Sequence, residues 1–374
     1  MIIRDPDPAA PLRIAVVGHV RFPIAAPFAG GMEAHSHSLV RALMARGHDV
    51  ALFAAGDGDP ALPLVPIVDR HYEAEMPWAR WHGTPRFAAM QKAIFARAWD
   101  EIERFAPDVV HNNSLSSDFI KSAAAHSIPT VTTLHVPPFR QLGDAIASSL
   151  TVPWLRYATV SEAQRRRWSP DAHPAFRAIP NGIDGWHWRP RGEKHAAAVW
   201  AGRITPTKGT GDAVRAARSA GVALNLFGPV ENELFFDEHV APFLSDTIRF
   251  HGPVGPDRLS EEVARASVAL VTPCWDEPFG LVAAEALACG TPVAGYSRGA
   301  IPEVVGSCGV LVEEGDVEGL ARAIPKAQAI DPVSCRERGL EFRHDVMIDT
   351  YERLYADAIA ALSSSASSTR LELA

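Results

Sequence analysis

Two carboxylates flank a short apolar segment of the chain: Glu277 precedes a Pro-Phe-Gly turn, and Glu285 follows eight positions later. Pro278 suits the first turn of a helix and Gly290 its end, so we expect a helix to begin near Phe279. At 1.5 Å rise per residue the carboxylates lie up to roughly 12 Å apart, too far to share one proton. At this separation the two carboxylates are suited to hold hydroxyls at the two ends of one extended ligand, such as one that contains a sugar and a ribose.

The start of the same helix offers hydrogen-bond donors. Its first backbone N–H groups, from Phe279 through Gly280 to Leu281, have no acceptor within the helix. Such groups favour an anion or sugar oxygens. The alternative interpretation makes Glu277 a charge at a helix N-terminus and Glu285 an ordinary solvated residue.

Two cations follow a predicted strand in the segment AGRITPTKGT (residues 201–210), namely Arg203 and Lys208. Both are expected at the carboxyl edge of a sheet, where doubly wound folds bind phosphate. Against a diphosphate each is worth up to about 4 kcal/mol at 4 Å if the effective dielectric is near 20. They would offset the charge of a leaving diphosphate without a metal. The alternative is a pair of surface cations.

The N-terminal half has its own candidates. Gly30 and Gly31 stand where a loop enters a helix, so the backbone can approach a phosphate closely, although a plain tight turn explains them equally. His111 and His135 each end a predicted strand, and both are candidates for a catalytic or a structural role. No Gly-x-Gly-x-x-Gly loop, P-loop or metal-binding motif is present.

Short β-branched segments alternate with helical patterns, which predicts parallel sheets in an α/β fold. In the first half, strands are expected at residues 13–20, 49–55, 108–112, 128–136 and 157–162, with helices near 87–104 and 117–126. In the second half, strands are expected at residues 196–204, 222–230, 248–254, 267–273, 291–297 and 309–314.

The length of 374 residues favours two doubly wound domains with a site in a cleft between them. The stretch at 178–195, rich in Pro, Gly and charge, reads as the hinge. We therefore expect domains at 1–182 and 183–345, a helix at 346–362 that crosses back to the first domain, and a disordered Ser-rich tail at 363–374.

Composition narrows the classes of function. The net charge of −8 disfavours nucleic acid as a partner. The four cysteines are widely spaced, which favours neither a zinc site nor a disulfide framework. No stretch is apolar enough to span a bilayer, and the acidic N-terminus does not read as a signal peptide. We expect a cytoplasmic protein, with peripheral membrane association left open.

Taken together, AGRITPTKGT, DEPFGLVAAEALACGTPVAG and GAIPEVV resemble the retaining glycosyltransferases of family 4, which have the GT-B fold of two Rossmann-like domains facing across a cleft. The resemblance implies that Arg203 and Lys208 bind the donor diphosphate, Glu277 the transferred sugar and Glu285 the ribose. It further implies roles at the donor for the amides of residues 279–281 and for Gly30 and Gly31. His135 matches a Thr-x-His position beside the reacting carbon.

The implied activity is transfer of a hexosyl group, with retention, from a nucleoside diphosphate sugar to a hydroxyl of a small-molecule, glycan or lipid-linked acceptor. No metal or cofactor is implied, and UDP is favoured as the nucleotide. His111, Trp78 and Trp81 are candidates to contact the acceptor. Ala300 and the pair Asn112-Asn113 depart from the commoner family pattern, which leaves acceptor choice open. A sugar-nucleotide epimerase and a non-catalytic nucleotide-sugar sensor are the alternatives.

Overall fold

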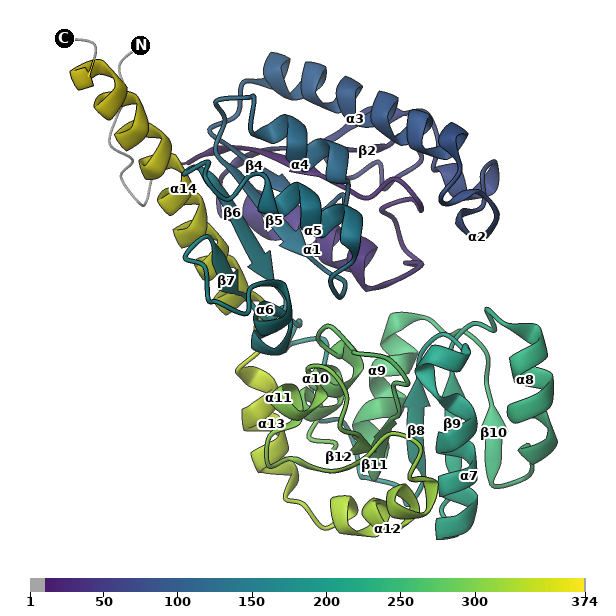
Figure 1. Ribbon diagram of the computed structural model, residues 1–374. Coiled ribbons are helices and arrows are strands. Elements are labelled where there is room, and N and C mark those ends of the chain that lie inside the picture. Colours follow the sequence, from purple (N-terminus) through teal and green to yellow (C-terminus); the bar gives the residue numbers. More distant parts are fainter. Residues whose placement is uncertain (1–10, 373–374) are drawn as a thin grey trace. The chain divides into compact units, whose positions relative to one another are not determined.

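The computed structural model describes residues 11–372, which form two compact units (Figure 1). The first unit comprises residues up to Val160, then Arg165–Ile179, and from Ile348 onward; the second comprises Ser161–Gln164 and Pro180–Met347. The division after Ile179 lies close to the boundary expected after residue 182. Among the described residues, no helix is long and apolar enough to cross a membrane.

The short segment Ser161–Gln164 joins the second unit because two side-chain contacts hold it there. The Ser161 hydroxyl donates to the carbonyl of Pro278 at 2.7 Å. The Glu303 carboxylate accepts from the backbone N–H groups of Glu162 and Ala163, each at 2.8 Å. A carboxylate at a helix start is favourable, so Glu303 stabilises the first turn of α6 (Glu162–Trp168). Nothing in the sequence pattern of this segment indicated that assignment.

The first unit is built on a seven-stranded parallel sheet in the order β3-β2-β1-β4-β5-β6-β7. Its strands are β1 (Arg13–Val17), β2 (Asp49–Ala55), β3 (Leu64–Val68), β4 (Val109–Asn112), β5 (Thr130–Leu134), β6 (Leu155–Thr159) and β7 (Phe176–Ala178). Its longer helices are α1 (Gly31–Ala45), α3 (Pro85–Phe105), α4 (Ser117–Ala123), α5 (Arg140–Ala147) and α14 (His344–Glu372), and α2 (Trp78–Trp81) is a single turn.

Both faces of this sheet are covered. In β1, four successive residues, Ile14 to Val17, are completely buried, as is typical of a parallel sheet with helices on each side. Ala15 and Val17 belong to one core cluster together with residues of α3 and α4, such as Trp99 and Phe119. On α14, Tyr351 and Tyr355 are also fully buried, and their hydroxyls bond to Thr133 within β5 and His111 within β4, respectively.

Helix α14 extends through residues 363–372, where composition predicts a disordered tail. The serine hydroxyls of the segment bond within the helix: Ser363 donates to the carbonyl of Ile359 at 3.2 Å and Ser364 to that of Ala360 at 3.0 Å. This back-bonding, added to propagation from an anchored helix, offsets the low helix preference of serine. Residues 373 and 374 lie outside the described range.

The second unit contains a six-stranded parallel sheet in the order β10-β9-β8-β11-β12-β13. Its strands are β8 (Ala198–Ala201), β9 (Leu224–Phe227), β10 (Ile248–Phe250), β11 (Val268–Val271), β12 (Val293–Tyr296) and β13 (Gly309–Val312). Its helices include α7 (Thr210–Ala220), α8 (Glu233–His239), α9 (Pro256–Arg265), α10 (Leu281–Ala288), α11 (Ile301–Val305), α12 (Val317–Gln328) and α13 (Pro332–Leu340).

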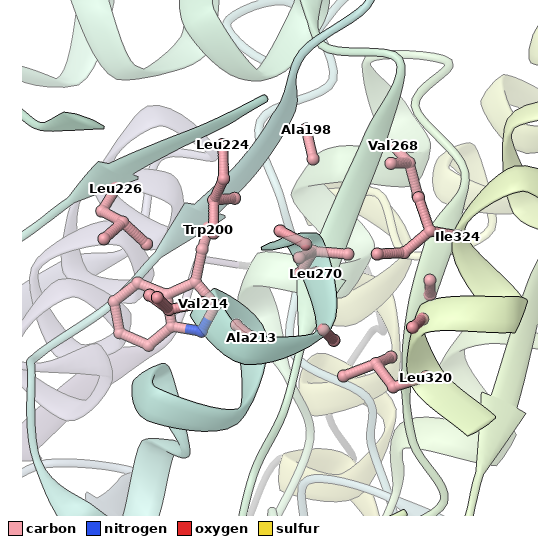
Figure 2. Packing of buried hydrophobic residues seen from close by; sticks show 14 of the residues in the cluster. Ala198, Trp200, Ala213, Val214, Leu224, Leu226, Val268, Leu270, Leu320 and Ile324 are labelled. Atoms are coloured by element: carbon pink, nitrogen blue, oxygen red, sulfur yellow. The ribbon is translucent and has the colours of Figure 1, made fainter. Parts of the chain in front are cut away.

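Figure 2 shows the core on one face of this sheet, where Trp200 and Leu270 from the strands meet Val214 of α7 and Leu320 and Ile324 of α12. All five are at most 2% exposed. Small residues of α7 in the same cluster, Ala213, Ala216 and Ala217, let helix and sheet approach closely. Both sheets reverse strand order between two adjacent strands, β1 and β4 in one and β8 and β11 in the other.

The prediction of an α/β fold with two doubly wound parallel sheets is confirmed. Two edge strands, β3 and β7, were not predicted. β3 contains Pro66, which has no backbone N–H to donate to a neighbouring strand. A proline in the pattern argues against a strand, although an edge strand tolerates it. β7 has only three residues, too few to show a period.

Candidate functional site

The loops that follow β8 and β11 meet at the switch point of the second sheet, where doubly wound folds bind ligands. The N–H of Cys274 donates to the carbonyl of Thr207 at 2.8 Å, and the Thr272 hydroxyl lies 3.0 Å from the carbonyls of both Lys208 and Gly209. Gly209 has a φ of +63°, and a Cβ there would lie 2.1 Å from the carbonyl oxygen of Thr272. Only glycine allows these loops to approach so closely.

Lys208 and Glu277 form an ion pair at this point. The Lys208 ammonium donates to Glu277 Oε2 at 2.6 Å, and the indole N–H of Trp275 donates to the same oxygen at 2.9 Å. The ammonium also lies 5.4 Å from the centre of the Trp275 ring. With side chains 26% and 14% exposed, the pair is shielded and yet within reach of a ligand. A cation and a carboxylate thus lie side by side at the carboxyl edge of the sheet, at its switch point.

The backbone of Glu277 is fixed by the loop after β12. The N–H of Ala300 donates to the carbonyl of Glu277 at 2.9 Å. Gly299 has a φ of +57°, and a Cβ there would lie 2.3 Å from the carbonyl oxygen and 2.4 Å from the nitrogen of Glu277. The loop therefore needs glycine at position 299 both for its conformation and for its contact with Glu277.

Helix α10 begins at Leu281, two residues later than the sequence predicts. Gly280 is its N-cap with a φ of +94°, and Phe279 is buried with only 3% exposure. Because the helix starts later, the donors of its first turn are the amides of Leu281 and Val282, and the prediction that they begin at Phe279 is corrected. The first turn still follows directly after Glu277, so these donors belong to the same site.

Arg203 follows β8 as predicted. Unlike Lys208, it pairs with Glu231 and not with Glu277. Its guanidinium donates to Glu231 Oε2 at 2.5 Å, and the two side chains are 46% and 44% exposed. An exposed pair of this kind contributes little to stability, so an incoming anion can replace the Glu231 carboxylate at small cost.

Glu285 lies in the middle of α10 and is partly covered by the protein. Burial raises the pKa of its carboxyl to about 7. A carboxyl held in this way is ready to accept hydrogen bonds from a ligand, because such bonds stabilise its ionised form. The predicted role at the ribose is chemically reasonable for such a group.

The raised pKa of Glu285 predicts a pH-dependent stability. The group usually titrates near 4.5 and in the folded chain near 7, so between these values the folded chain holds one proton that the unfolded chain has released. Stability therefore falls as the pH rises through this window. Glu285→Gln is expected to exceed the wild type in unfolding free energy by about 3 kcal/mol at pH 8 and by less than about 1 kcal/mol at pH 5.

Urea unfolding of both proteins at the two pH values measures this difference. The matched control is Glu337→Gln on α13, where the side chain is exposed and the charge is lost without a burial penalty. If the unfolding free energies of the wild type and Glu285→Gln changed equally with pH, the raised pKa of Glu285 would be contradicted.

In the first unit, His135 follows β5 and is 8% exposed, whereas His111 in β4 is completely buried. Burial lowers the pKa of each ring to about 3, so both are neutral at physiological pH. His111 bonds to Tyr355 and Thr133 on either side of its ring. The ring of His111 is thus enclosed by the protein, and the acceptor contact expected of it would require these neighbours to move.

The glycine pair stands at the start of α1, where Gly30 is the N-cap with an extended φ of −165°. This backbone is open to any residue, so the expected conformational need for glycine is absent at Gly30. Glu33, in the first turn of α1, is 5% exposed, and its carboxylate lies 3.7 Å from His19. Gly31 is the first residue of the helix.

Trp78 and Trp81 lie in the single turn α2, where Trp78 is 42% exposed. Trp78 stacks on His82 with ring centres 4.1 Å apart, and Arg21 lies 5.3 Å from the Trp78 ring. Arg86 lies 5.3 Å from the ring of Trp81. Aromatic faces beside cations are suited to flat or hydroxylated ligands.

Four residues were not predicted as parts of these sites: Trp275, Gly299, Glu33, and Asn113, whose Oδ1 lies 2.9 Å from Nε2 of His135 and 3.2 Å from Nε2 of His111. Trp275 and Gly299 lie within or beside the motifs quoted above, so proximity in the sequence was the available signal. Glu33 and Asn113 could not be found in this way, since their significance rests on side-chain contacts. Among residues 11–372, no group of three or more His, Cys, Asp and Glu side chains could hold a metal ion.

Comparisons with known sequences support one class of protein. The chain matches the family model described as Glycosyltransferase Family 4 over residues 29–185 and the model described as Glycosyl transferases group 1 over residues 196–328. A glycogen synthase of Mycobacterium tuberculosis is 28% identical, over 88% of this chain and 90% of its own. A D-inositol 3-phosphate glycosyltransferase of Acidothermus cellulolyticus is 27% identical, over 94% and 92%.

Solved structures share the fold over nearly the whole chain. Sucrose-phosphate synthase from Thermosynechococcus elongatus has a TM-score of 0.75 at 20% identity, covering 93% of this chain and 99% of its own. HepE of Anabaena in complex with UDP has a TM-score of 0.70 at 16% identity, covering 91% and 98%.

Proposed function

The chain belongs to the glycosyltransferases of the GT-B fold, and we propose that it transfers a sugar, with retention of configuration, from a nucleoside diphosphate sugar to a hydroxyl group of an acceptor. The observation that carries the proposal is the Lys208–Glu277 pair at 2.6 Å, placed at a switch point beside the first turn of α10. A cation for a phosphate and a carboxylate for sugar hydroxyls are what such a donor requires.

On binding, the donor would separate this pair. Lys208 would turn to the diphosphate, and Glu277 would accept hydrogen bonds from hydroxyls of the transferred sugar. The amides of Leu281 and Val282 would add donors to the anion, and Arg203 would exchange Glu231 for the diphosphate. Glu285 would accept from the ribose hydroxyls. UDP is the proposed nucleotide, and the complex of HepE with UDP, in the same fold, supports testing it first.

The reaction we propose needs little from a protein base. The bond between the anomeric carbon and the diphosphate oxygen breaks, and the acceptor oxygen bonds to the same carbon on the same face. The departing phosphate oxygen takes the acceptor's proton. The protein contributes preorganised positive charge at the leaving diphosphate, which Lys208, Arg203 and the first turn of α10 supply. We propose that no metal takes part, and turnover in excess EDTA is the test.

The acceptor, we propose, binds to the first unit near α2. Trp81→Ala is expected to raise the KM for the acceptor by roughly 3- to 10-fold with little change in kcat, since stacking on an aromatic ring is worth about 1 kcal/mol. Steady-state kinetics with saturating donor measures the effect. The control is Trp186→Ala in the second unit, where the ring is 78% exposed and also faces an arginine, Arg189. An unchanged acceptor KM in Trp81→Ala would remove this residue from the acceptor site.

Donor binding is tested by thermal shift with UDP, GDP, ADP and their common sugar conjugates, on the wild type and Glu285→Ala. One nucleotide should stabilise the wild type selectively, the matching sugar should add to that effect, and the mutant should lose most of it. No stabilisation by any of these compounds would contradict the proposed donor class.

Release of free nucleoside diphosphate then separates three activities. A transferase releases it only when the acceptor is present. An epimerase acts on the donor alone and converts its sugar, and a sensor binds the donor without converting it. Release that depends on the acceptor is the expected result.

A further inference from the structure

Two hydrogen bonds from distant segments hold the backbone of the turn that carries Glu277. The N–H of Ala300 donates to the carbonyl of Glu277 at 2.9 Å. The hydroxyl of Ser161 donates to the carbonyl of the next residue, Pro278, at 2.7 Å. All four residues belong to the second unit. The turn is therefore supported at two successive carbonyl groups, by the loop after β12 and by the residue that precedes α6.

Ser161 uses its hydroxyl both as an acceptor and as a donor. Its oxygen accepts from the N–H of Gln164 at 3.1 Å, which fixes the side chain at the start of α6. Its hydrogen is directed to Pro278, because a carbonyl oxygen can only accept. The serine is completely buried. Alanine at this position would remove the bond to Pro278, whereas threonine would keep the hydroxyl.

Glu303 joins the two supports to each other. Its carboxylate accepts from the N–H groups of Glu162 and Ala163, which follow Ser161 directly, each at 2.8 Å. Glu303 lies on α11, the helix whose N-cap is Ala300. The start of α6 is thus anchored to the same short helix that begins at the support of Glu277.

These contacts form a closed cycle within the second unit. From the turn of Glu277 it runs through Ala300 to Glu303, then to the start of α6, and through Ser161 back to the turn. A side chain that must meet a ligand with fixed geometry needs such support from residues behind it. The carboxylate of Glu277 is the group that this cycle orients, and its Oε2 accepts from Lys208 at 2.6 Å.

We propose that Ser161 and Glu303 are positioning residues, which hold the turn so that the carboxylate of Glu277 meets the hydroxyls of the transferred sugar. The proposal rests on the proposed function, in which Glu277 binds that sugar. Neither residue contacts the donor in this assignment, since both act through the backbone of the turn. Their loss should weaken the binding of the sugar and leave the binding of the nucleotide unchanged.

The first test needs no ligand, so it is independent of the proposed activity. The indole N–H of Trp275 donates to Glu277 Oε2 at 2.9 Å and therefore reports the position of the carboxylate. Indole ¹H–¹⁵N correlation spectra of the full chain with ¹⁵N-labelled tryptophan contain this signal, and Trp275→Phe identifies it. Ser161→Ala and Glu303→Gln are each expected to shift it toward its position in Glu277→Gln, and Ser161→Thr should restore it. An unchanged signal in Ser161→Ala and Glu303→Gln would overturn the proposal.

Two variants in the same unit serve as matched controls. Ser260 is also completely buried, and its hydroxyl also donates to a backbone carbonyl, that of His187, at 2.8 Å. Asp331 is a carboxylate that accepts from a backbone N–H at a helix start, that of Ser334, at 2.9 Å. Ser260→Ala and Asp331→Asn should leave the Trp275 signal in place even if they lower the thermal stability. Shifts as large as those of the test variants would reduce the effect to a general loss of packing.

The second test separates the sugar from the nucleotide by calorimetric titration with UDP and with UDP-glucose. Ser161→Ala is expected to raise the Kd for UDP-glucose by roughly 3- to 10-fold, the scale of one hydrogen bond, and to leave the Kd for UDP unchanged. In the Glu277→Gln background the same substitution should have no further effect. Equal weakening of both ligands would contradict the positioning role. If neither ligand bound the wild type, the proposed donor would be rejected, and the Trp275 signal would still decide the role of Ser161 and Glu303.

Discussion

Lys208→Ala is expected to lower turnover by roughly 10² to 10³, the scale of removing one preorganised donor from a developing anion. The ammonium stands at the switch point within 2.6 Å of Glu277 and is 26% exposed, so in the proposed reaction it would act on the leaving diphosphate in a partly shielded environment. The measurement is single-turnover kinetics with saturating donor, which separates the chemical step from binding. Arg203→Ala is expected toward the lower end of the same range, because Arg203 is more exposed.

Lys326→Ala on α12 is the control, since that lysine is exposed and lies outside the site. A second test uses the pairing itself. Because Lys208 and Glu277 are in contact, the effects of Lys208→Ala and Glu277→Gln should be non-additive in a double-mutant cycle. Wild-type turnover in Lys208→Ala would reject its role at the diphosphate.

Gly299→Ala is expected to destabilise the protein by about 2 to 4 kcal/mol and to abolish most activity. Two costs add together at this position. The φ of +57° is unfavourable for alanine, and the new Cβ would lie within 2.4 Å of backbone atoms of Glu277. The backbone must move, and the carboxylate of Glu277 moves with it. Urea unfolding and turnover of the same preparation measure the two consequences.

Gly315→Ala separates the two costs. Its φ of +82° is equally unfavourable, but no heavy atom lies within 4 Å of the added Cβ. This variant should lose only about 1 kcal/mol and retain activity. If Gly299→Ala and Gly315→Ala were equally stable and active, the contact with Glu277 would not matter.

The charged side chains at the switch point of the second unit are paired with one another. Lys208 pairs with Glu277, and Arg203 pairs with Glu231. A cation and a carboxylate left unpaired in a shielded site would be costly. The proposed donor would therefore have to offer both Lys208 and Glu277 better partners, through its phosphate and hydroxyl groups, than they have in each other.

The sequence by itself determined the architecture of the two sheets and which residues gather at the switch point of the second one. Alternation of β-branched segments with helical periods is a local property, so it predicted the two parallel sheets and the places where β8 and β11 end. Once those ends are known, Arg203, Lys208 and Glu277 must lie at the same edge, and the structure places Lys208 against Glu277. The edge strands β3 and β7 were not predicted, because β3 contains a proline and β7 is too short to show a period.

Only the tertiary structure decided the state of each side chain. Both histidines end strands and look alike in sequence, yet α14, more than 200 residues away, encloses His111 completely and supplies the hydroxyl of Tyr355. The pKa of Glu285, the contact of Gly299 with Glu277 and the sharing of Asn113 between two rings likewise depend on distant segments. Desolvation and hydrogen bonding are set by which atoms surround a group, and a one-dimensional pattern does not record them.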